Sequence, residues 1–164
     1  MCVTKISSCL VENLTRQAKS NIRLRLHHNF HANYADPVQH LVNSINIDSY
    51  IRPHRHSLDP KSECLIALKG SFALIIFDDY GLVVDVVKFE SERYVNDDSN
   101  YGVNVTSGIW HTVIALEQDS VLFEVKCGPF NPLKAKEFAS WAPAEGSNEA
   151  LFYLANLRNS LGYT

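Results

Sequence analysis

Short apolar segments separated by turn residues are the feature that most restricts what this chain can fold into. Runs of four to eight residues rich in valine, isoleucine and leucine follow one another, closed by glycine, aspartate, asparagine or serine. Segments of this length with turns between them are typical of antiparallel sandwiches and small barrels. No helical crossover interrupts them, which disfavours a parallel sheet. We therefore expect strands at residues 22–30, 38–51, 64–70, 71–77, 82–89, 103–106, 109–116 and 120–126.

Helical patterns appear only toward the two ends of the sequence. Residues 8–20 place apolar side chains on one helical face, and Ser7 or Ser8 can cap the first turn. Further along, residues 133–143 predict a short helical turn and residues 148–162 predict a longer helix.

The length of 164 residues is typical of one domain. We expect a helical segment at residues 1–21, a β-barrel core at residues 22–128 and a helical extension at residues 129–164. The fold class expected is therefore mainly β, a small antiparallel β-barrel of jelly-roll type with short helices at the N- and C-termini.

The composition excludes some classes of binding partner. The net charge of −3 gives no basic surface for nucleic acid, so we expect no nucleic-acid partner. No stretch approaches the roughly 18 apolar residues of a membrane span, and the first residues lack a secretory apolar core, so we expect no membrane partner and a cytoplasmic location. Four cysteines without a CxxC pair do not predict a disulfide scaffold, and Cys64 and Cys127, which lie in apolar runs, are expected to be buried.

Two histidines one residue apart are the strongest functional signal. In a strand, His54 and His56 point to the same face, and buried imidazoles need partners that a divalent ion would supply. Glu63, on a strand expected to run back beside the histidine strand, would add an oxygen ligand, and His111 a third nitrogen ligand. We expect Gly70 to close this strand in a tight hairpin with a positive φ. Such a mixed set suits one divalent transition-metal ion, namely zinc, iron, manganese, nickel or cobalt.

The residues from His54 to Gly70, and TSGIWH at residues 106–111, resemble the two motifs of the cupin superfamily. In cupins these motifs supply three histidines and one glutamate to a metal inside a small β-barrel. The resemblance implies that the chain is a cupin whose ligands are His54, His56, Glu63 and His111.

The sequence departs from the cupin pattern at two places. The loop of residues 57–62 is longer than the usual spacing before the glutamate. Thr106 and Ala115 stand where the second motif commonly has proline and asparagine.

A more extensive resemblance runs from Arg23 to Gly146. Several segments in the same order are similar to the WbuC-type cupin fold metalloproteins, namely HHNFHANYADPVQHLVNSI, SYIRPHRH, GIWHTV, FEVKCGPF and EFASWAPAEG. That family is associated with bacterial surface-polysaccharide clusters, so the resemblance implies a metal-bearing cupin near polysaccharide biosynthesis. It implies no particular reaction.

Other polar residues are candidates for contacts with a small-molecule substrate. Arg52 shares the strand parity of the histidines and could hold a carboxylate or phosphate, or lie on the surface. Glu124 could be a catalytic acid or base if its strand face lines a cavity, or could face solvent. His28, Asn29 and His31 form a polar cluster that could contact substrate or orient a ligand, or belong to an exposed loop.

A row of arginines alternates with apolar residues near the start of the β region. Arg23 and Arg25 would suit phosphate groups if this face lines the cavity, and a solvated outer face explains them equally well. The apolar row of Ile22, Leu24 and Leu26 is expected in the core.

Three functional hypotheses follow. The first is a metal-dependent isomerase, epimerase or lyase acting on a sugar or nucleotide-sugar, with the sugar implied by the resemblance alone. The second is an Fe(II)-dependent dioxygenase, and the third is a carbohydrate-binding cupin module without enzymatic activity. Exposed strand edges of such a fold could pair with a second copy, so we expect a homodimer.

Overall fold

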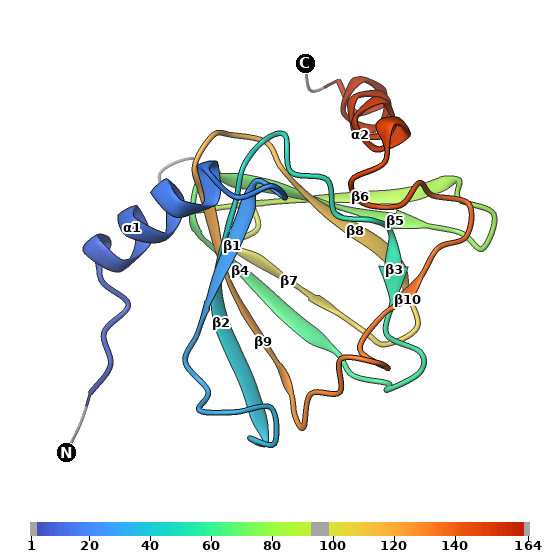
Figure 1. The fold of residues 1–164 in the computed structure, drawn as a ribbon. Coiled ribbons are helices and arrows are strands. Elements are labelled where there is room, and N and C mark those ends of the chain that lie inside the picture. The colour runs from blue at the N-terminus through green and yellow to red at the C-terminus, as the bar shows by residue number, and fades with distance from the viewer. Residues whose placement is uncertain (1–2, 93–98, 163–164) are drawn as a thin grey trace.

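Two five-stranded antiparallel sheets face each other and form the body of the molecule (Figure 1). The computed structural model describes residues 3–92 and 99–162. The first sheet has the order β1 (Arg25–Asn29), β2 (Val38–Ile45), β9 (Ser120–Cys127), β4 (Glu63–Lys69) and β7 (Gly102–Val105). The second has the order β10 (Glu137–Phe138), β3 (His54–Arg55), β8 (Trp110–Ala115), β5 (Ser71–Phe77) and β6 (Val83–Glu90).

The mainly β jelly-roll prediction is confirmed. Among the described residues no strand pairing joins the two sheets, so the fold is a two-sheet sandwich and not a closed barrel. Every strand predicted from the apolar runs has a counterpart within a few residues, apart from the run at 38–51. That run contains β2 and ends before the short strand β3.

Two helices cover the outer faces of the sandwich, α1 (Ser8–Lys19) on the first sheet and α2 (Asn148–Ser160) on the second (Figure 1). The Ser7 side chain accepts a hydrogen bond from the Leu10 N–H and caps α1, as predicted. Buried Leu14 of α1 packs with Val42 and Val121 of the first sheet. Neither helix in the described part of the chain is long and apolar enough to span a membrane.

Strand β5 packs on both of its faces, against the first sheet on one side and against α2 on the other. Its burial is almost continuous because alternate side chains enter two different cores. Phe72 and Leu74 point between the sheets, where they meet Leu122 of the first sheet. Ala73 and Ile75 point outward, into the cluster that also contains α2.

The connection at Gly70 differs from the hairpin we expected. Gly70 does have a positive φ of 75°, but β4 and β5 do not pair with each other. β4 pairs with β7 and β9, and β5 pairs with β6 and β8. Gly70 therefore carries the chain from the first sheet to the second.

The predicted helical turn at residues 133–143 is wrong. This segment contains strand β10, in which Glu137 pairs with Arg55 and Phe138 with His54. Backbone pairing with β3 outweighs the weak local preference of this segment for helix. The prediction of a helix at residues 148–162 is confirmed by α2.

Three smaller expectations also need correction. The strand expected from residue 22 begins at Arg25, because Leu24 adopts a positive φ, and Ile22 lies on the surface rather than in the core. Cys64 is half-buried and Cys127 is exposed, so neither is a fully buried packing residue. Cys2 lies outside the described residues.

Candidate metal centre

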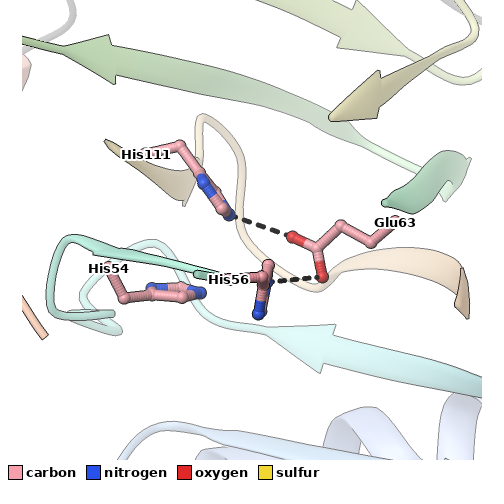
Figure 2. A group of neighbouring side chains, drawn as sticks. All are labelled: His54, His56, Glu63 and His111. Carbon is pink, nitrogen blue, oxygen red and sulfur yellow. Dashed lines mark hydrogen bonds and ion pairs between the residues drawn. The ribbon is translucent and has the colours of Figure 1, made fainter. Parts of the chain in front are cut away.

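Four side chains predicted as metal ligands meet between the two sheets (Figure 2). His54 lies in β3, His56 directly follows it, and His111 lies beside His54 in β8. We expected Glu63 on a strand next to the histidine strand, and this is wrong. Glu63 is the first residue of β4, and its side chain reaches the histidines from the other sheet. All four residues are buried, and one ligand atom from each lies within 4.8 Å of the others.

Backbone carbonyls fix the orientation of the three imidazoles. His54 Nδ1 lies 2.9 Å from the Arg52 oxygen, and His111 Nδ1 lies 2.8 Å from the Ile109 oxygen. His56 Nδ1 lies 2.5 Å from the Ala135 oxygen. Because a carbonyl oxygen only accepts hydrogen bonds, each Nδ1 must carry the hydrogen. In a neutral ring, Nε2 then keeps a free lone pair for a metal ion.

The Glu63 carboxylate faces the Nε2 atoms of two of these rings. Its two oxygens lie 3.0 Å from His111 Nε2 and 3.3 Å from His56 Nε2. Burial alone would raise the pKa of Glu63, but the neighbouring imidazoles of His111 and His56 outweigh this and hold the pKa well below its usual value. Burial also lowers the pKa of His54 well below its usual value, helped by nearby Lys136. The site therefore combines an ionised carboxylate with a neutral imidazole, the forms that ligate metals.

One buried atom of the cluster lacks a hydrogen-bond partner. His56 Nε2 has an ion-pair neighbour in Glu63, but the geometry does not make a hydrogen bond. Buried polar atoms without partners are costly, and a divalent ion among three nitrogens and a carboxylate would satisfy this one. The residues present therefore fit the predicted transition-metal ion.

A cavity of about 300 Å³ opens beside the cluster, between the sheets. His54, Glu63 and His111 line it, so a small molecule inside the cavity reaches the centre of the cluster. Many other lining residues are polar or charged, namely Arg23, Arg25, His27, Asn29, His31, Gln39, Asn43, Glu124, Lys126 and Lys136.

The structure separates the predicted substrate-binding residues into two groups. Glu124, Asn29 and His31 line the cavity. His28 and Arg52 are absent from the lining. His28 packs edge-on against Phe30, on the opposite face of β1.

Arg52 has a structural role in place of the predicted one. Its guanidinium donates two hydrogen bonds to the Ala139 oxygen and lies over the Phe138 ring. Its backbone N–H donates to Glu145. Arg52 therefore ties the segment after β10 to the segment before β3.

Glu124 forms an ion pair with Lys126, which lies on the same face of β9. Its carboxylate accepts a hydrogen bond from Lys126 Nζ at 2.5 Å, and Lys126 also lies 4.0 Å from Glu63. Burial would lower the pKa of Lys126, but these two carboxylates outweigh it and raise that pKa. The polar face of β9 thus faces the cavity, which is the first of the two alternatives predicted for Glu124.

Sequence reasoning missed Lys136 and His27 as cavity residues. Lys136 precedes β10, in the segment predicted as helical, so its strand parity could not be read. His27 shares the cavity-facing parity of Arg25, a signal that the sequence contained. Burial lowers the pKa of Lys136 below its usual value, although Glu63 partly offsets this.

Comparison with known proteins gives a family and a fold. A family model described as a domain of unknown function (DUF6016) matches residues 6–89, which include His54, His56 and Glu63 but not His111. No curated protein matches the chain.

Several solved structures have a similar fold at low sequence identity. Protein SO0799 from Shewanella oneidensis matches with a TM-score of 0.55 at 10% identity, over 87% of each chain. The capsular polysaccharide assembling protein CapF from Staphylococcus aureus matches with a TM-score of 0.50 at 19% identity, over 68% of this chain and 28% of its own. KdgF from Halomonas sp. gives a TM-score of 0.47 at 13% identity, over 66% of this chain and 81% of its own. At these identities the similarities to SO0799 and CapF show the fold alone.

Proposed function

The chain belongs to the DUF6016 family, a domain of unknown function, and we propose that it is a metal-binding cupin protein. One divalent transition-metal ion would be held by the metal-centre residues His54, His56, Glu63 and His111. A substrate would enter through the adjoining cavity.

The orientation of the three imidazoles is the observation that carries this proposal. Each Nδ1 is occupied by a backbone carbonyl, which leaves Nε2 as the metal-binding atom of each ring, and one ligand atom from each ring and from Glu63 lies within 4.8 Å of the others. A structural role for the histidines would not require all three rings to be oriented through Nδ1 around the same carboxylate. Outer hydrogen bonds of this kind are the usual support of metal-ligating histidines.

We propose isomerase, epimerase or lyase chemistry on a sugar or nucleotide-sugar in surface-polysaccharide biosynthesis. The polysaccharide setting comes from the resemblance to WbuC-type cupins, and CapF, named for capsular polysaccharide assembly, has the same fold. A metal at this site would supply Lewis-acid polarisation of a carbonyl or hydroxyl group. Glu124, which lines the cavity beside Lys126, would accept or return a proton of the substrate.

The proposal is tested by the metal content of the untagged protein. We expect close to one equivalent of a transition metal by elemental mass spectrometry, lost in His54→Ala and in His111→Ala. His28→Ala is the matched control, because His28 is exposed and lies outside the cavity lining, and it should keep the metal. Absence of metal after reconstitution with zinc, iron, manganese, nickel and cobalt in turn would rule the proposal out.

The identity of the metal separates the alternatives. Iron together with oxygen consumption in the presence of sugars would favour an Fe(II)-dependent dioxygenase. Sugar binding without conversion would favour a carbohydrate-binding module. Conversion under anaerobic conditions would support the isomerase, epimerase or lyase proposal.

The homodimer and the cytoplasmic location stay predictions. Strands β1, β7, β10 and β6 lie at the edges of the two sheets among the described residues and are the places where a second copy could pair. Sedimentation analysis of the purified protein would decide between a monomer and a dimer.

A further inference from the structure

Most charged groups of the cavity have partners of opposite charge. The Arg25 guanidinium lies 2.5 Å from the Glu145 carboxylate and also donates to the Tyr50 oxygen. Lys126 is paired with Glu124. These charges are compensated within the protein, so they do not by themselves call for a charged ligand.

Lys136 is different. It lines the cavity, and within the described residues its ammonium group has neither a hydrogen bond nor an ion pair. Its neighbours in sequence are fixed on both sides. The Ala135 oxygen accepts from His56, and Glu137 accepts two hydrogen bonds from Arg55. The backbone at Lys136 is therefore held in place, while its ammonium group has no hydrogen-bonded or ion-paired partner among the described residues.

A metal ion would add to this excess of positive charge. Resting on the proposed function, the centre would carry a divalent cation with one carboxylate, that of Glu63, among its ligands. The interior end of the cavity would then hold one surplus charge at the metal and a second at Lys136. Uncompensated charges in a partly dry site are costly unless a ligand of opposite charge binds.

We propose that the cavity takes a small organic anion, and that Lys136 binds its carboxylate or phosphate group beside the metal centre. Ammonium groups are common ligands of both kinds of anion. The polar wall on β1, with His27 and Asn29, faces the same cavity and would contact the uncharged part of the ligand.

The volume limits the size of this anion. Ligand pockets run from about 300 to 1,000 Å³, and this cavity lies at the lower end of that range. It suits a molecule of the size of one sugar ring, such as a sugar acid or a sugar phosphate. A complete nucleotide-sugar would have to leave its nucleotide outside.

The test compares anions with a neutral sugar on the metal-loaded protein. Glucuronate, glucose 6-phosphate, inorganic phosphate and glucose are titrated by calorimetry at constant ionic strength. We expect at least one of the anions to bind more tightly than glucose. Lys136→Met keeps the aliphatic part of the side chain. We expect this variant to bind that anion about tenfold or more weakly, the effect of losing one charge-assisted hydrogen bond. Glucuronate and glucose 6-phosphate separate a carboxylate from a phosphate ligand.

Two variants keep the test specific. Lys134→Met removes an exposed lysine from the same segment and should leave binding unchanged. Lys136→Arg keeps the charge and should retain most of the affinity. If no anion binds better than glucose, or if Lys136→Met binds the anions as tightly as the parent, the inference is overturned. Metal content measured on the same samples distinguishes this outcome from a failure of the metal centre itself.

Discussion

At the scale of single residues, the two carboxylates of the cavity have separate partners. Glu63 contacts His111 Nε2, whereas Glu124 accepts a hydrogen bond from Lys126. Both are glutamates that face the interior from neighbouring strands of the first sheet. Their different partners predict different roles.

Exchanging each carboxylate for an amide tests this difference. We expect Glu63→Gln to lower the affinity for the metal by at least about tenfold. Mutation of a residue that only hydrogen-bonds to a metal ligand already lowers metal affinity by that factor, and Glu63 would be a ligand itself. Glu124→Gln should bind the metal as the parent does. Competition with a chromogenic chelator measures both affinities. Equal losses in the two variants would contradict the assignment of Glu63 as the ligand.

Strand alternation was sufficient to predict the histidine pair but not the face of every polar residue. His54 and His56 were predicted to share a face because they are two residues apart in a strand, and His111 was predicted from the motif at residues 106–111. Arg52 was misplaced because its parity holds only if the strand extends past Pro53, and β3 begins at His54.

At the scale of elements, the passage at Gly70 joins the two sheets. The residue has a φ of 75°, and a Cβ added there would lie 2.3 Å from the Ser120 Oγ. Both the backbone conformation and the lack of space therefore require glycine at this position. The sequence predicted the positive φ but not the change of sheet, because a tight hairpin and a crossing between sheets both use glycine.

Two glycine substitutions separate the cost of the positive φ from the cost of the missing space. Gly108 has a φ of 84°, and nothing lies within 4 Å of an added Cβ. We expect Gly108→Ala to lower the free energy of unfolding by about 1 to 2 kcal/mol, the cost of the left-handed backbone alone. Gly70→Ala should cost about 2 to 4 kcal/mol, because overpacking against Ser120 is added. Denaturant titration measures both, and equal values would show that Ser120 moves aside freely.

Strand β10 shows what local sequence could not reveal. Residues 133–143 contain a weak helical pattern, and their true conformation depends on pairing with β3, which is about 80 residues earlier in the chain. The Ala135 oxygen and Lys136 come into the site with this pairing. A segment whose structure is set by a distant partner cannot be assigned from its own residues.

At the scale of the whole molecule, the metal centre connects the two sheets. His54 and His111 lie in the second sheet, His56 directly follows its strand β3, and Glu63 comes from the first sheet. A bound ion would therefore hold the sheets together at this end, in addition to the apolar contacts between them. Binding to the folded state alone stabilises it in proportion to the logarithm of the ligand concentration.

Metal removal should therefore lower the stability of the parent protein. At a free metal concentration about 100 times the dissociation constant, the expected gain in the free energy of unfolding is about 2.7 kcal/mol. Thermal unfolding with and without a chelator measures this difference. His54→Ala should unfold at the same temperature in both conditions, and a chelator effect of equal size in that variant would place the metal elsewhere.

The strand order of the first sheet has a consequence for synthesis on the ribosome. β9 lies between β2 and β4, so residues 38–45 and 63–69 share a partner at residues 120–127. Neither early strand can complete its pairing until that late strand has emerged, and the Ala135 support of His56 emerges later still. The nascent chain must therefore carry these two apolar strands without their shared partner until residues 120–127 have emerged, and it gains its metal-binding geometry only after Ala135.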